Sequence, residues 1–182
     1  MLNIYRHYQI ILRSLRNIMA TNNAINQIWP MPAFYATLSA PVLNVTGDGS
    51  DYTLIADTEL YDYGANYNNG TGTFVAPVAG LYQFSTTMLV DPVIIGAGLA
   101  GYVKFHTSVT DYVGGTIIAS YSTFALGNAL TAQFTTTIHL IASETVNVVI
   151  SITQPGGAKN IDILANVVIP TSFNGYLIRQ SF

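Results

Sequence analysis

The stretch from Gly70 to Phe84, GTGTFVAPVAGLYQF, places a glycine-threonine turn, a proline, a second glycine and an aromatic alternation in one short segment. We expect a turn at Asn69–Gly72, because glycine readily adopts the positive φ angles that turns require. Pro77 cannot donate a backbone hydrogen bond, so the chain must lie at a sheet edge or a corner there. Tyr82 and Phe84 then share one face of a strand. The stretch predicts a strand in two parts, bent at a corner, whose rings enter a core.

The period of two continues through the rest of the chain. Alternation of apolar and polar residues is seen in the following segments: Leu81–Val90, Tyr102–Val109, Phe134–Ile141 and Thr145–Thr153. Glycine-rich turn signals separate these segments, and no helical period appears after the N-terminal segment. Many short strands of this kind predict a β-sandwich or a barrel.

Charged residues are scarce in this sequence. They make up 8% of the 182 residues, whereas hydrophobic residues make up 50%; a typical soluble domain carries roughly 25% charged residues. No apolar run approaches the ~18 residues of a membrane-spanning helix, so we expect no transmembrane segment. The shortage of charge has two explanations: burial of surface against other copies of the chain, or a monomer with a hydroxyl-rich surface.

The charge distribution and the lack of cysteine exclude several classes of function. Half of the basic residues, Arg6, Arg13 and Arg16, lie near the N-terminus, and the rest of the chain is acidic. Because that part offers no stripe of cations to a phosphate backbone, we expect no nucleic-acid binding. The sequence has no cysteine, which excludes disulfides, cysteine-based zinc sites and a thiol nucleophile.

Residues 1–32 are predicted to be an N-terminal amphipathic helix and a linker, followed by one β-domain over residues 33–182. Within residues 1–17 and just beyond, apolar side chains recur in steps of four and three: Ile4, Tyr8, Ile11, Leu15 and Ile18. Three interpretations remain open: a short multimerising stalk, an anchor to a larger particle or fibre protein through residues 1–30, or translation that starts at Met19. A helix lying on a membrane surface ranks below these.

Four landmarks of the β-domain occur in a fixed order. They are Ala33-Phe34-Tyr35-Ala36; Tyr67 followed by Thr71–Phe84; Leu140–Val146, with Ser143-Glu144 where glycine and aspartate are usual; and Phe173-Asn174-Gly175-Tyr176-Leu177. Together they resemble the globular head domain of complement component one, subcomponent q, a relative of the tumour necrosis factor jelly rolls. The resemblance covers residues 33–178, and the motif and core residues that it implies are Phe34, Phe74, Pro77, Gly80, Tyr82, Phe84, Phe173, Gly175 and Tyr176.

The resemblance implies an all-β, ten-strand-type jelly-roll sandwich that packs as a threefold homotrimer with aromatic side chains along the axis. The chain has no Gly-X-Y repeat, so the roles of relatives that carry collagen stalks are not transferred. Some relatives hold calcium near the trimer apex, but residues 120–133 contain no carboxylate here. The motifs look closest to the collagen-free heads of bacterial, phage and large-virus surface proteins.

Candidate sites for chemistry are few, and we expect no enzyme. The three histidines, His7, His106 and His139, belong to no catalytic motif. Asp48 and Asp51 are weak candidates for a calcium site, although a turn explains Asp48 equally well. No cofactor is expected.

Tyrosines supply the candidates for ligand binding: Tyr61, Tyr63, Tyr112 and Tyr121. Tyrosine is favoured at recognition surfaces, although each ring could instead line the trimer axis or the core. Two functional hypotheses follow. The first is a trimeric recognition or adhesion head, outside the cell or on a virion or cell surface, that binds a cell-surface glycan or protein. The second is a structural fibre tip or particle decoration without its own ligand.

Overall fold

The structure is a computed structural model that describes residues 31–93, 100–116 and 129–181. The helix predicted within residues 1–17 and the candidate Tyr121 lie outside the described residues. Residues Pro32–Phe182 form one compact unit. No helix occurs among the described residues, so these residues include no helix that could span a membrane.

The described residues form thirteen strands, which confirms the predicted all-β class. Their bounds are β1 Ala33–Thr37, β2 Val42–Thr46, β3 Asp48–Thr53, β4 Thr58–Tyr63, β5 Tyr67–Asn68, β6 Thr73–Val75, β7 Gly80–Asp91, β8 Ala100–Thr107, β9 Asp111–Thr116, β10 Leu130–Leu140, β11 Thr145–Thr153, β12 Ile161–Leu164 and β13 Ser172–Gln180.

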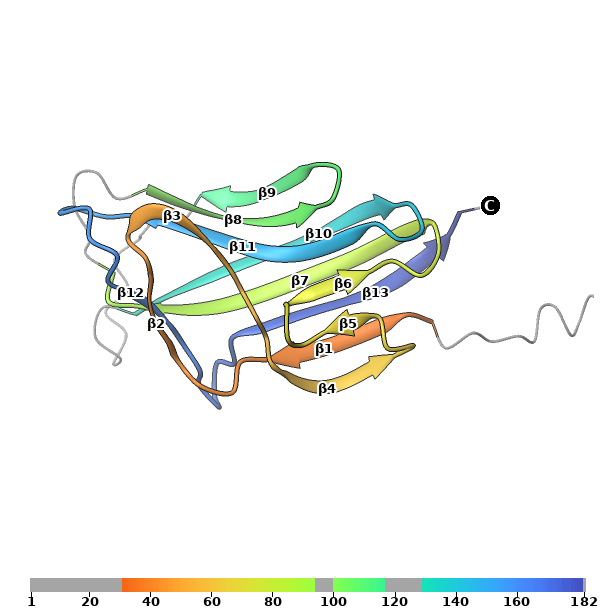
Figure 1. Cartoon of the computed structure of the whole chain (residues 1–182), viewed down its shortest axis with the longest axis horizontal. Coiled ribbons are helices and arrows are strands. Elements are labelled where there is room, and N and C mark those ends of the chain that lie inside the picture. Colours follow the sequence, from red (N-terminus) through yellow and green to blue (C-terminus); the bar gives the residue numbers. More distant parts are fainter. Residues whose placement is uncertain (1–30, 94–99, 117–128, 182) are drawn as a thin grey trace, which may run out of the picture. The chain divides into compact units, whose positions relative to one another are not determined.

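Two antiparallel sheets make up the sandwich. The seven-stranded sheet has the order β2-β12-β7-β13-β1-β4, and β10 pairs with the opposite edge of β7 along almost its whole length. The five-stranded sheet has the order β5-β6-β11-β8-β9. Figure 1 shows the long strands of the two sheets running side by side, with the described chain beginning at β1 and ending after β13 at the same end of the sandwich. This is the layered arrangement of a jelly roll.

The stretch from Gly70 to Phe84 connects the two sheets. β6 belongs to the five-stranded sheet and β7 to the seven-stranded sheet, so the predicted corner at Pro77 is the point where the chain changes sheet. Gly72 has a φ of +68°, as expected for the turn before β6. Gly80 does not have a positive φ. A side chain is excluded there by close packing, because a Cβ would lie 2.5 Å from the carbonyl oxygen of Arg179.

Aromatic rings fill the space between the sheets. Phe34 of β1 stacks on Tyr67 and on Phe74, with ring centroids 4.6 and 5.1 Å apart, and meets Phe173 edge-on at 4.8 Å. Fully buried rings in the core are those of Phe34, Phe74, Tyr82, Phe84, Phe105 and Phe173. Each buried phenylalanine contributes about 1.5–3 kcal/mol through removal of its surface from water.

Two of the residues in the motif and core set are exposed and lie outside the core. Pro77 is exposed in the turn between β6 and β7. Tyr176 lies on the outward face of β13 with 43% of its surface exposed, because the strand alternates and its neighbours Gly175 and Leu177 face inward. Gly175 is needed inside, since a Cβ on it would overlap the ring of Phe84.

Candidate functional site

The outward face of the seven-stranded sheet carries uncharged side chains in three rows across β4, β1, β13, β7 and β10. The strand register gives the rows as Tyr63–Ala33–Tyr176–Gln83–Thr137, Tyr61–Tyr35–Asn174–Ser85–Thr135 and Thr58–Thr37–Ser172–Thr87–Gln133. We call this surface the tyrosine face. It combines aromatic rings at the β4 edge with hydroxyl and amide groups toward β10. The hydroxyl oxygens of Ser85 and Thr135 are hydrogen-bonded at 2.7 Å.

The rings at the β4 edge form a continuous group. Tyr61 and Tyr63 stack with centroids 5.2 Å apart and planes 21° apart, and Tyr35 lies 6.2 Å from Tyr61. Tyr61 and Tyr63 are 42% and 55% exposed, so a large apolar area is open to a partner. Two of the four ligand-binding candidates thus lie together. The third, Tyr112, is separate from them: it faces inward from β9 and packs against the core.

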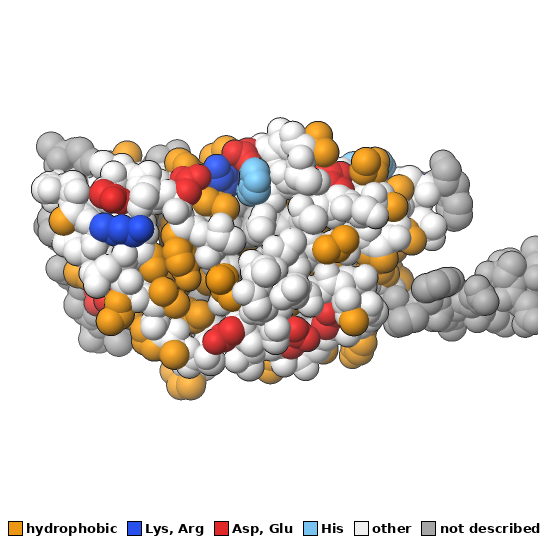
Figure 2. All heavy atoms as spheres, in the orientation of Figure 1, with side chains coloured by type: hydrophobic (Ala, Val, Ile, Leu, Met, Phe, Trp, Pro, Cys, Tyr) orange, Lys and Arg blue, Asp and Glu red, His pale blue; other side chains and the backbone are white. Residues whose placement is uncertain are grey.

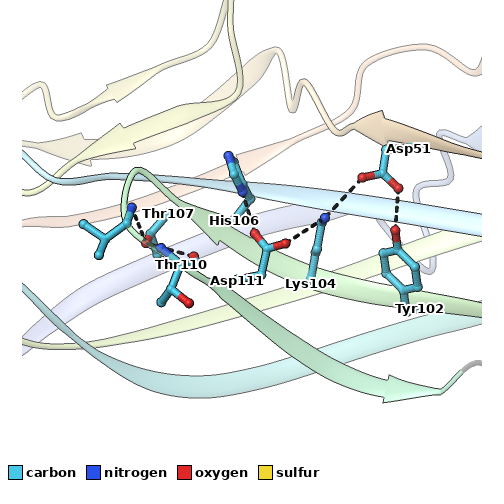
Figure 3. Close-up of polar contacts among 8 residues, drawn as sticks. Asp51, Tyr102, Lys104, His106, Thr107, Thr110 and Asp111 are labelled. Carbon is cyan, nitrogen blue, oxygen red and sulfur yellow. Dashed lines mark hydrogen bonds and ion pairs between the residues drawn. The ribbon is translucent and has the colours of Figure 1, made fainter.

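The outward face of the five-stranded sheet carries a different feature, a compact group of charged and polar side chains. It consists of Asp51, Tyr102, Lys104, His106 and Asp111, and we call it the outer-sheet cluster. Figure 2 shows acidic, basic and histidine side chains meeting at one place near the upper edge of the view, and Figure 3 shows that Lys104 reaches from β8 to a carboxylate on each side. The Lys104 Nζ lies 3.1 Å from Asp51 and 3.0 Å from Asp111.

Local structure positions each member of the outer-sheet cluster. Tyr102, Lys104 and His106 alternate along β8 with buried residues and therefore share its outward face. Thr107 holds the turn to β9: its Oγ1 accepts the backbone N–H groups of residues 109 and 110, and its hydroxyl donates to the Thr110 carbonyl. The turn brings Asp111 directly opposite His106, and Asp111 Oδ1 lies 2.5 Å from His106 Nδ1.

Electrostatics keep the two carboxylates and the lysine of the outer-sheet cluster ionised. The hydrogen bond from Tyr102, helped by Lys104, lowers the pKa of Asp51. Contacts with His106 and Lys104 lower the pKa of Asp111. Burial opposes the charge of Lys104, but its bonds to Asp111 and Asp51 outweigh this and raise its pKa. The lysine side chain is only 13% exposed, so its charge is covered by its two partners.

The two calcium candidates do not act together. Asp48 accepts the backbone N–H and the hydroxyl of Ser50, an Asx turn, whereas Asp51 turns toward Tyr102 and Lys104. Among the described residues, no three histidine or acidic side chains are grouped as metal ligands would be.

Histidine positions agree with the alternation of their strands. His106 and His139 are both exposed on outward faces. His139 Nε2 lies 2.8 Å from the Ser181 hydroxyl. Among the residues that the structure describes, no carboxylate bonds to that histidine, so they do not supply the third group of a catalytic triad.

The outer-sheet cluster was not predicted as a unit from the sequence. One signal was available: Tyr102, Lys104 and His106 at steps of two, followed by a short turn and Asp111, predict four polar groups on one hairpin face. The contribution of Asp51 was not accessible in this way, because β3 reaches β8 only through long-range packing beside β11.

The sequence profile of the C1q domain family matches residues 33–178, which is most of the chain. The chain belongs to the C1q domain family. A solved structure described as the globular domain of zebrafish complement 1qA matches with a TM-score of 0.54 and 18% identity, covering 82% of this chain and 99% of that one.

Murine APRIL, crystallised at pH 8.5, matches with a TM-score of 0.52 and 8% identity, covering 80% of this chain and 98% of that one. Identities this low support the fold alone. Comparison with curated proteins gives no match.

Membership in the family carries coarse functional information. C1q domains are non-enzymatic recognition modules that typically form trimers, bind ligands and act outside the cell. Nothing among the described residues of this C1q domain points to catalysis. The predicted resemblance and jelly-roll fold are confirmed.

Proposed function

We propose that this C1q domain is a trimeric recognition or adhesion head that binds a cell-surface glycan or protein and is displayed on a viral, phage or bacterial surface. The tyrosine face is the assembly surface in this proposal. One observation carries it: three rows across five strands contain no charged side chain, and stacked, exposed tyrosines lie at one edge.

A surface of this kind suits burial against a copy of itself. The cores of subunit interfaces are depleted in charge and enriched in tyrosine. Burial of the tyrosine face leaves no ionised group without a partner, whereas uncompensated burial of a charge is strongly destabilising. The rings at the β4 edge of one subunit would pack on the hydroxyl and amide rows near β10 of the next, a head-to-tail contact that closes into a ring.

Light scattering of the purified protein tests the assembly. We expect three times the chain mass of 19.6 kDa, unchanged on dilution. Replacing Tyr61 and Tyr63 together by serine should release folded monomers, because each buried tyrosine lost from an interface centre typically costs more than about 1 kcal/mol. Val113→Ser removes an equally exposed apolar side chain from the other sheet and should leave the trimer intact. A wild-type monomer, or a trimer unaffected by the double substitution, would refute the assembly.

Binding tests the recognition role. The trimer should bind glycans or cell-surface proteins when presented to arrays of both. If no array ligand binds, the alternative of a structural tip or decoration replaces the recognition head.

A further inference from the structure

We infer that the outer-sheet cluster is a binding site for neutral carbohydrate. The inference rests on the proposed recognition function and assigns it a place on the five-stranded sheet and a ligand class. Tyr61 and Tyr63, which the sequence offered as ligand contacts, are then assigned to assembly, and ligand recognition moves to the opposite face of the sandwich.

The two carboxylates of the outer-sheet cluster are held in place and still have free acceptor capacity. Asp51 uses one oxygen for the Tyr102 hydroxyl, at 2.5 Å, and the other for Lys104. Asp111 likewise divides its oxygens between His106 and Lys104. A carboxylate offers about four lone-pair positions, so roughly two on each remain. The side chains of Asp51 and Asp111 are 48% and 40% exposed, which leaves these positions open to a ligand.

His106 adds a third hydrogen-bonding group. The ionised carboxylate of Asp111 can only accept, so the His106 Nδ1 beside it carries the proton. The Nε2 atom of the same ring is left to bond a ligand hydroxyl group. The His106 side chain is 53% exposed, so the site presents polar groups from three side chains on β3 and the β8–β9 hairpin.

The charge of the outer-sheet cluster selects among ligand classes. Anionic ligands find no free cation, because Lys104 is covered by its two carboxylates, and they meet two negative charges. A cationic ligand would have to compete with Lys104, which already bonds one oxygen of each carboxylate. The hydroxyl groups of a neutral ligand are neither repelled by the carboxylates nor in competition with Lys104. They donate hydrogen bonds to ionised carboxylates, and such charge-assisted bonds are about twice as strong as neutral ones.

An apolar surface borders the acceptors. Val113 pairs with Lys104 in the β8–β9 register and is 64% exposed on the same outward face. Val109, in the turn between these strands, is 73% exposed. A sugar ring presents hydroxyl groups at its edge and C–H groups on its faces, so acceptors beside a small apolar surface match it better than they match a uniformly polar ligand.

The site needs little ordering when a ligand binds. Its members lie on strands, and the turn beside it is held by Thr107. Pre-positioned groups reduce the entropy that binding costs. A single shallow site still binds weakly, and display of three copies on one trimer would raise the overall strength.

The test compares glycan binding by the wild-type trimer and matched variants. A printed array of neutral, sialylated and sulfated oligosaccharides is the probe. We expect signals on neutral glycans only. Asp111→Asn should reduce binding to those spots by at least about tenfold, since it removes an ionised acceptor that bonds His106 and Lys104. Asp51→Asn should do the same. Asp48→Asn is the control: it changes the same charge outside the cluster and should leave binding unchanged.

Light scattering on each variant verifies that the trimer is intact, so a binding loss is not a folding loss. Neutral-glycan binding that survives both cluster substitutions would overturn the site while leaving the recognition function standing. Binding only to acidic glycans or only to proteins would overturn the ligand class. Absence of any ligand on glycan and protein arrays would overturn the recognition function itself.

Discussion

The close approach of β13 to the aromatic core makes Gly175→Ala a sharp test of the packing. Gly175 faces inward opposite Phe84 of β7. A Cβ at this position would overlap the Phe84 ring and lie 3.0 Å from Phe34. Phe84 has little freedom to retreat, because four rings surround it with centroids 5.5–6.1 Å away: Phe74, Phe105, Phe173 and Tyr82.

The expected cost follows from this confinement. Overpacking a core typically lowers the free energy of unfolding by about 1–3 kcal/mol. Because the Phe84 ring is confined on all sides, we expect Gly175→Ala to cost about 3 kcal/mol, the upper end of this range. The φ of Gly175 is not positive, so backbone strain adds nothing. For a domain of this size, a loss of about 3 kcal/mol lowers the Tm by roughly 6–12 °C. The assay is thermal unfolding at fixed protein concentration, because assembly couples the Tm to concentration.

A double-mutant cycle separates the clash from other causes. Phe84→Leu alone is destabilising, but it removes the ring atoms that the new methyl group meets. Gly175→Ala should therefore cost less in the Phe84→Leu background than in the wild type, by more than about 0.5 kcal/mol. An equal cost in both backgrounds, or a cost below about 1 kcal/mol in the wild type, would refute the packing argument.

Two further substitutions test the corner and the outer-sheet cluster. Gly80→Val should prevent folding, since its Cβ would lie 2.5 Å from the Arg179 carbonyl oxygen, a backbone atom that cannot yield; an unchanged melting curve would contradict this. Lys104→Met should lower stability by up to about 1 kcal/mol near neutral pH. The aspartate partners of Lys104 have pKa values below their ordinary 3.8, so the difference from wild type should persist from pH 7 to 5 and disappear as the pH falls below that value. A difference that grows on acidification would exclude the ion pairs as its source.

Much of the fold was predictable because the local patterns agree with the tertiary structure. Alternation along β7, β8 and β11 assigned the inward faces, and the turn before Phe74 and the corner at Pro77 marked the change of sheet. The exposure of Tyr176 was not predictable, because a motif states which residue is required and not which face it occupies. The motif's glycine at position 175 fills the inward position, and the tyrosine faces out.

The candidate site was less accessible from the sequence. Tyr61 and Tyr63 were named as candidates for ligand binding, but their grouping with Tyr35 depends on the β1–β4 register, which includes a bulge between Tyr35 and Ala36. Asp51 was assessed as a partner of Asp48 because the two are close in sequence. The structure separates them, since a turn satisfies Asp48 and a residue of β8 satisfies Asp51.

The uneven distribution of charge between the two sheets determines which face a trimer can bury. The tyrosine face offers rings, hydroxyls and amides, and a copy of the same chain can cover them without desolvating an ion. The outer-sheet cluster carries two ionised carboxylates, Asp51 and Asp111, and a lysine whose charge they compensate. Burial of that face would remove the water that completes the solvation of both carboxylates, and among the described residues no second lysine or arginine forms an ion pair with either of them. Assembly through the tyrosine face is therefore favoured on electrostatic grounds, and it leaves the outer-sheet cluster facing solvent, where a ligand can reach it.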